Sequence, residues 1–119
     1  MSELPFIEKT IVMSSAATGN SAAFAIGGKG PLRIAVSLPD TTSADGDFSV
    51  LLSDREAGTF LVRGALDADD QVTLTKTAGA ALSDELVVQR PAATWAKVRY
   101  DKDSGGAASE ITAAVQSWE

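Results

Sequence analysis

Apolar and polar residues alternate along much of this chain, in short runs that predict β-strands. The clearest run contains Leu32, Ile34, Val36 and Leu38, which are separated by single residues and followed by Pro39. Because successive side chains of a strand point to opposite faces, this run predicts a strand with one buried face. Shorter runs predict further strands at residues 7–13, 22–26, 48–52, 60–62, 71–76, 86–89, 95–100 and 111–118.

The last third of the chain predicts a β-hairpin. Residues 95–100 and 111–118 both alternate with a period of two, and Gly105-Gly106 lies between them. Glycine pairs are typical of tight turns between antiparallel strands. We therefore expect the C-terminal segment, up to Trp118, to lie inside a sheet.

About eight short strands and no convincing helical period predict an all-β fold. Residues 78–86 are ambiguous, since they could form a single helical turn, which Gly79 weakens. We expect a two-sheet antiparallel β-sandwich, jelly-roll-like, with a closed barrel as the alternative. The prediction divides the chain into an N-terminal arm at residues 1–6 and a single sandwich domain at residues 7–119. The expected inward-facing residues are Ile34, Val36, Val50, Leu52, Val72, Leu74, Val98 and Ile111.

The chain contains neither cysteine nor histidine, and this excludes several kinds of chemistry. Disulfides, thiolate metal sites and hydrolase mechanisms that need an imidazole base are impossible. The net charge is −6, from 16 acidic and 10 scattered basic residues, which disfavours nucleic acid as a partner. No apolar run approaches the ~20 residues of a membrane span, and no export signal is visible at the N-terminus. We expect no enzyme activity, no catalytic residue, no cofactor, no metal site, and no nucleic-acid or membrane partner.

Three acidic runs resemble calcium ligand sets, because hard cations prefer clustered carboxylate oxygens. They are Asp45-Gly-Asp47, Asp67-Ala-Asp-Asp70 and Asp101-Lys-Asp103. None fits a twelve-residue calcium loop, and aspartate and glycine are common in turns, so we interpret all three as turns. Gly27-Gly-Lys-Gly30 likewise predicts a turn between strands, since a phosphate loop would continue into Lys-Ser/Thr and a helix.

Other candidate groups have an ordinary structural explanation beside the functional one. Asp54 and Glu56 could serve as a glycosidase pair, but solvated loop charges are the commoner case. Trp95 and Trp118 could stack on sugar rings, while tryptophan in a sandwich is more often part of the core.

The apolar segment Leu4-Pro5-Phe6-Ile7 is the candidate partner contact of the chain. Pro5 fixes an extended backbone, so the segment could lie in a groove or pair with a sheet edge of a neighbour. Equally, Phe6 and Ile7 could cover the core of their own domain.

The order of these segments resembles the small jelly-roll capsid cement, or decoration, proteins of tailed bacteriophages. The resemblance covers nearly the whole chain, and it rests on the order of the segments. The segments that carry it are Gly30-Pro-Leu-Arg-Ile-Ala-Val36, Phe48-Ser-Val-Leu-Leu-Ser53, Trp95-Ala-Lys-Val-Arg-Tyr100, the Gly105-Gly106 turn and the terminal Ile111-Thr-Ala113 strand.

The resemblance implies a structural virion protein on the outer surface of a phage capsid, made in the cytoplasm of the bacterial host. It would bind the shell of major capsid protein as a homo-dimer or homo-trimer at local symmetry axes, and it would bridge and stabilise neighbouring subunits. The alternative is a carbohydrate-binding β-sandwich module of a host-recognition apparatus, with the tryptophans as its platform.

Overall fold

Ten β-strands form the described part of the protein, which covers residues 6–14, 18–27, 30–38, 45–103 and 110–118 in a computed structural model. These residues include no helix, and hence no helix that could cross a membrane. The strands are β1 (Phe6–Ser14), β2 (Gly19–Asn20), β3 (Phe24–Ala25), β4 (Leu32–Leu38), β5 (Gly46–Ser53), β6 (Leu61–Val62), β7 (Thr73–Lys76), β8 (Leu82–Val88), β9 (Trp95–Lys102) and β10 (Glu110–Trp118).

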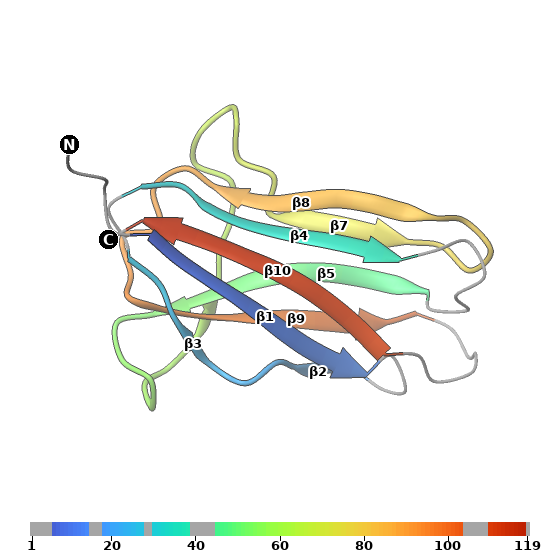
Figure 1. Cartoon of the computed structure of the whole chain (residues 1–119), viewed down its shortest axis with the longest axis horizontal. Coiled ribbons are helices and arrows are strands. Elements are labelled where there is room, and N and C mark those ends of the chain that lie inside the picture. The colour runs from blue at the N-terminus through green and yellow to red at the C-terminus, as the bar shows by residue number, and fades with distance from the viewer. Residues whose placement is uncertain (1–5, 15–17, 28–29, 39–44, 104–109, 119) are drawn as a thin grey trace.

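The strands form two antiparallel sheets that face each other (Figure 1). The four-stranded sheet has the order β1-β10-β4-β8. In the six-stranded sheet β9 lies beside β5, while β2 and β3 pair with successive parts of β9, and β6 and β7 with successive parts of β5. Each sheet therefore has four strand positions, in the order of a jelly roll. The expected two-sheet antiparallel sandwich is confirmed.

The core is a single layer of apolar side chains between the sheets. In β4 the alternation is complete, with Leu32, Ile34, Val36 and Leu38 buried and the residues between them exposed. Seven of the eight expected inward-facing residues are buried, while Val72 is partly buried against the same cluster. Phe48 and Tyr100 are a buried aromatic cross-strand pair, with ring centroids 5.1 Å apart.

The predicted C-terminal β-hairpin is wrong, because β9 pairs with β5 in the six-stranded sheet whereas β10 lies between β1 and β4 in the four-stranded sheet. The ambiguous segment at residues 78–86 also folds differently from the prediction. Residues 77–80 form a β-turn, in which the Ala80 N–H donates to the Thr77 carbonyl at 3.0 Å, and β8 already begins at Leu82 rather than near residue 86. Gly79 has φ of +81°, a left-handed conformation that suits glycine and ends any helical path. The first half of β8 contains Ser83 and Asp84, which hid it from a search for apolar alternation.

Lys76 is an unexpected member of the interior. It follows Leu74 at the inward-facing spacing of β7 and is completely buried. Its Nζ donates to the Thr77 carbonyl at 2.6 Å, at the end of the strand. The aliphatic part of the side chain thus adds to the core while the ammonium group stays hydrogen-bonded.

Truncating the core should lower stability strongly. We expect Ile34→Ala to reduce the free energy of unfolding by about 2–5 kcal/mol and Val98→Ala by about 1–3 kcal/mol, because each removes buried methyl groups and leaves a cavity. The exposed Ser37→Ala, on the same strand as Ile34, should change it by less than about 0.5 kcal/mol. Urea unfolding of the three variants measures this, and an unchanged midpoint for Ile34→Ala would contradict the assigned faces of β4.

Candidate functional site

The connection between β5 and β7 exposes large apolar side chains to solvent. Leu61, Val62 and Leu66 are 69%, 63% and 74% exposed. We call these three residues the apolar end, because Leu61 and Val62 form β6, which pairs with Leu51 and Leu52 near the end of β5. An isolated exposed leucine is ordinary, but several in one connection are a feature of surfaces that meet a partner.

Hydrogen bonds fix this connection to the sandwich. The Arg63 N–H donates to the Val50 carbonyl at 2.8 Å, and the Arg63 Nη2 donates to the Arg90 carbonyl at 2.8 Å. The hydroxyl of Thr94 donates to the Asp54 carbonyl at 2.9 Å. The connection is therefore held to the β8–β9 loop at several points, and its leucines are exposed by an ordered backbone.

A second anchor is the carboxylate of Asp70. It accepts hydrogen bonds from the backbone N–H groups of Gln89 at 2.8 Å, Leu66 at 2.9 Å and Asp67 at 3.1 Å. These bonds, chiefly that from Gln89, lower the pKa of Asp70 below its ordinary value of 3.8. Asp70 thus holds the backbone that carries Leu66, and residues 67–70 form the turn that their composition predicts.

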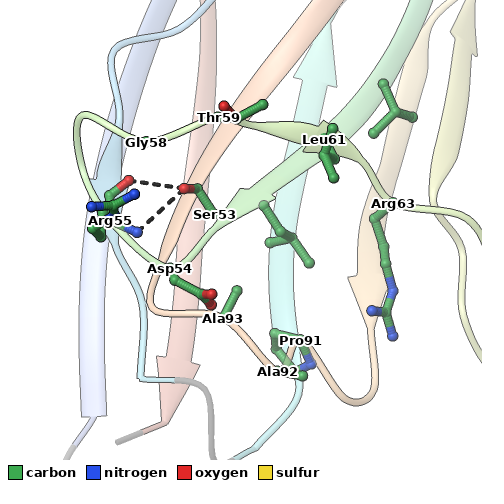
Figure 2. A pocket seen from close by; sticks show the side chains of 12 residues that line it. Ser53, Asp54, Arg55, Gly58, Thr59, Leu61, Arg63, Pro91, Ala92 and Ala93 are labelled. Atoms are coloured by element: carbon green, nitrogen blue, oxygen red, sulfur yellow. Dashed lines mark hydrogen bonds between the residues drawn. The ribbon is translucent and has the colours of Figure 1, made fainter.

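A hollow of about 480 Å³ lies beside the apolar end (Figure 2). The apolar walls are Leu61, Val62, Pro91 and Ala93, and the charged groups are Asp54, Arg55 and Arg63. Figure 2 shows the Ser53 side chain beside Arg55: its hydroxyl donates to the Arg55 carbonyl at 2.9 Å and accepts from the Arg55 N–H at 3.2 Å. Ser53 therefore shapes a turn, and its hydroxyl is engaged on both sides.

The backbone around the hollow is tightly constrained. A Cβ atom at Gly58 would lie 2.7 Å from the Ser53 hydroxyl, so only glycine fits there without a shift. Ala92 has φ of +53°, which costs a residue with a Cβ about 1 kcal/mol. The guanidinium of Arg63 is packed in as well, and its buried Nε has no hydrogen-bond partner among the described residues. The hollow is a shape fixed by the β5–β6 and β8–β9 connections.

Two of the acidic runs come together where β5 meets β9. Asp47 lies opposite Asp101, and the Asp103 N–H donates to the Asp45 carbonyl at 2.8 Å. Asp47 accepts a hydrogen bond from Thr75 at 2.8 Å, and Asp101 forms an ion pair with Arg99 at 2.9 Å. In the part of the chain that the structure describes, no three acidic side chains are placed to hold a metal ion.

An aromatic and aliphatic cluster lies on the outer face of the six-stranded sheet. Trp95, half-buried, and Lys97 alternate outward on β9, and the Lys97 ammonium lies 4.4 Å from the centre of the Phe60 ring. Leu51 lies opposite Lys97 and next to Val62, and it is only 6% exposed although it faces away from the core. Trp95 is therefore not a core residue. The side chain of Trp118 lies outside the described part.

The remaining sequence candidates are only partly placed. Leu4 and Pro5 lie outside the described residues, whereas the backbones of Phe6 and Ile7 belong to β1, opposite Trp118 and Ser117 of β10. β1 thus begins one residue before the expected boundary of the arm. Asp54 and Glu56 are exposed in the loop after β5. Gly28 and Lys29 are not described, while the Gly27 N–H donates to the Ser117 hydroxyl at 3.2 Å.

Sequence reasoning missed the apolar end. Residues 60–62 were expected to form a strand and therefore to be paired and half covered, and Leu66 carried no pattern at all. The signal that was available is the shortness of this apolar segment, which is followed directly by Gly64 and an acidic run. Such a segment is too short to form a full-length strand that covers the core.

Comparison with known proteins gives no match: no protein-family model fits the sequence, and neither a curated protein nor a solved structure matches it.

The Asp70 anchor predicts a pH-dependent loss of stability. Asp70→Asn should lower the free energy of unfolding by about 1–2 kcal/mol near neutral pH, because a neutral amide is a weaker acceptor for three N–H groups. The folded pKa is lowered, so the contribution of Asp70 is complete above the unfolded value of 3.8 and is lost as pH falls further. Urea unfolding of parent and variant should give equal differences at about pH 7 and about pH 5, and a smaller one at about pH 3. The exposed neighbour Asp69→Asn is the control, and a difference independent of pH would contradict this role.

Proposed function

We propose that this protein is a structural, non-enzymatic protein that binds the outer surface of a phage capsid shell and bridges neighbouring subunits of major capsid protein. It would act in the virion after synthesis in the bacterial cytoplasm, as a homo-dimer or homo-trimer. The observation that carries the proposal is the apolar end, an ordered surface of exposed leucine and valine side chains on a small acidic sandwich. Such side chains gain free energy when a partner covers them, at about 25 cal/mol per Å².

The jelly-roll strand order supports the proposal, since it is the fold that the resemblance to cement proteins implies. The hollow beside the apolar end is shaped by turns, and its serine is engaged by backbone. An open recess of this kind, with apolar walls and the charges of Asp54, Arg55 and Arg63, suits a side chain of a partner protein. Many copies on one shell would also allow each contact to be weak, because the particle is held by all of them together.

The segment Leu4 to Ile7 remains the second proposed contact. Its last two residues, Phe6 and Ile7, begin β1 and lie opposite Trp118 and Ser117 of β10. A shell-binding surface would then combine the apolar end of the domain with the apolar N-terminal segment.

One observation favours the alternative, a carbohydrate-binding module. The half-buried Trp95 and the Phe60–Lys97 pair share the outer face of the six-stranded sheet. Aromatic side chains on a sheet face can stack on sugar rings. A tryptophan-fluorescence titration with sugars distinguishes the two functions, since saturable quenching at Trp95 together with no shell binding would favour the alternative.

Shell binding tests the proposal directly. We expect the protein to co-sediment with purified expanded shells of the phage that encodes it, and Leu61→Ser/Leu66→Ser to weaken this binding at least about tenfold, because burying one leucine is worth about 1.5–3 kcal/mol. The control Asp103→Asn should bind like the parent. Particles that lack the protein should release DNA at lower temperature. Failure of the parent to sediment would reject the function, whereas parent-like binding of the double variant would reject only this surface.

Deletion of residues 1–6 tests the second contact. The isolated domain should keep most of its stability, while occupancy on shells should fall, because a short apolar segment adds affinity only when its partner is present. Thermal unfolding and shell sedimentation measure the two effects separately. Equal occupancy of the full-length and the shortened protein would reject a role for Leu4 to Phe6.

A further inference from the structure

We propose that β1 is the self-association surface of this protein, and that two copies pair their β1 strands antiparallel about a two-fold axis. This inference deepens the proposed function, from which it takes the expectation of a homo-oligomer. It rests on a difference between the edges of the two sheets. A strand edge with free backbone groups is a template for another strand, and proteins that do not use such an edge block it.

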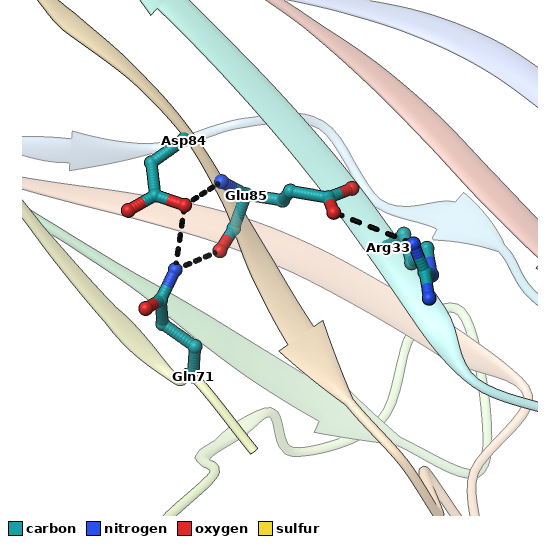
Figure 3. Close-up of polar contacts among 4 residues, drawn as sticks. All are labelled: Arg33, Gln71, Asp84 and Glu85. Atoms are coloured by element: carbon teal, nitrogen blue, oxygen red, sulfur yellow. Dashed lines mark hydrogen bonds and ion pairs between the residues drawn. The ribbon is translucent and has the colours of Figure 1, made fainter. Parts of the chain in front are cut away.

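The β8 edge of the four-stranded sheet is blocked. Gln71 forms a bridge to Val87, with N–H to carbonyl distances of 2.9 and 2.8 Å. The Gln71 side-chain amide also donates to the Glu85 carbonyl at 2.6 Å and to Asp84 at 2.9 Å (Figure 3). The Glu85 N–H donates to the Asp84 carboxylate at 2.8 Å.

The block continues beyond Glu85, because the Gln89 N–H donates to the Asp70 carboxylate at 2.8 Å. The outward backbone groups of this edge are therefore occupied from Glu85 to Gln89. Side-chain hydrogen bonds and one backbone bridge therefore cover this edge without an additional strand.

The edges of the six-stranded sheet are interrupted. One edge consists of β2 and β3, which have two residues each, and the other of β6 and β7, which have two and four residues. Short strands offer few consecutive hydrogen bonds to an added chain. β1 differs, because it spans nine residues, follows one unbroken register along β10 and contains no proline.

The open backbone groups of β1 follow from the alternation of an antiparallel ladder, in which successive residues direct their groups to opposite sides. The backbone N–H and C=O groups of Glu85 and Val87 point outward from β8, so those of Leu86 point to Ile34 of β4. By the same alternation, the backbone groups of Ala35 point to Ala114 of β10, and those of Ala113 point to Ile11 of β1. The open side of β1 therefore carries the backbone groups of its even-numbered residues, among them Thr10 and Val12.

The side chains of this edge suit a second strand. Thr10 and Val12 are exposed on the outer face, with Val12 58% exposed, and both are β-branched. A hollow of about 320 Å³ beside them is lined by Lys9, Thr10 and residues 114–116 of β10. A pair centred on Ile11 places Thr10 opposite Val12 of the second copy and keeps the two Lys9 charges from lying opposite each other.

Symmetry follows from the same facts. Of the described edges, β1 alone is long and has no described hydrogen bond on the open side of its backbone, so the matching edge on a second copy is again β1. An interface in which both partners use the same surface closes as a two-fold dimer. The pairing joins two four-stranded sheets into one continuous sheet.

The experiment is sedimentation equilibrium of the purified full chain between about 5 and about 500 µM, a range that detects a dissociation constant near 0.1 mM. We expect the mass to rise from 12.3 kDa toward twice that value. Thr10→Pro removes an N–H of the open side and spares the pairing with β10, so it should abolish the rise while the fold persists. Val12→Lys should do the same by adding charge at the edge, whereas Leu66→Lys, an equal change at the apolar end, should still dimerise.

Hydrogen exchange gives a second readout, because the amides of Thr10 and Val12 should exchange more slowly as the parent concentration rises. A monomer at every concentration, a trimer, or a dimer that survives both Thr10→Pro and Val12→Lys would overturn the proposal. Should Thr10→Pro fail to fold, Val12→Lys decides alone. Shell sedimentation of a folded monomeric variant separates this proposal from the proposed function, because binding without dimerisation would reject only the β1 surface.

Discussion

Antiparallel pairing between segments far apart in the chain is the interaction on which this structure depends. β10, the last strand, lies between β1 and β4, and β9 lies between β2, β3 and β5. Both sheets therefore receive a central strand from the C-terminal quarter of the chain, and neither sheet is continuous without it. Because such contacts close long loops, a fold of this kind forms more slowly than one built from local pairs. Burial of the inward-facing layer, which includes Ile34, Val98 and Ile111, offsets the entropy cost of this closure, since the layer is buried only when both sheets are complete.

The same topology places two different surfaces on a small domain. Connections between strands gather at the two ends of the sandwich, and the longest described one, between β5 and β7 of the six-stranded sheet, carries Leu61 and Leu66. Arg63 and Asp70 hold that connection in place through backbone hydrogen bonds, so its apolar side chains stay exposed without loss of order. The sheet edges form the second kind of surface. At an edge, the unpaired backbone N–H and C=O groups attract another strand. Gln71 forms hydrogen bonds with these groups on β8, whereas no described residue does so on the open side of β1.

These two surfaces lie on separate parts of the domain and use different physical forces. The apolar end gains free energy by excluding water from aliphatic groups, which favours any partner of matching shape. The β1 edge gains it from directed backbone hydrogen bonds, which require an extended partner strand. A protein proposed to bind a shell through the apolar end and its own copies through the β1 edge can therefore do so without competition between these two contacts.

The alternation of short apolar runs such as residues 32–38 was enough to determine the all-β class and to name eight inward-facing residues, seven of which are buried, because side chains of a strand alternate whatever its neighbours are. It favoured a sandwich and left a closed barrel as the alternative. Only the tertiary structure decided which strands are neighbours, because antiparallel partners such as Ile11 and Ala113 are distant in sequence and share no local signal.

For the same reason the sequence favoured a contact at Leu4 to Ile7 but missed Leu61 and Leu66. Whether a leucine is buried depends on what the fold places over it, and an exposed one has the same local sequence as a buried one. The blocked β8 edge and the open β1 edge are likewise tertiary facts. They arise because Gln71 meets Val87 across a turn in the chain, while β1 has a partner on one side alone among the described strands.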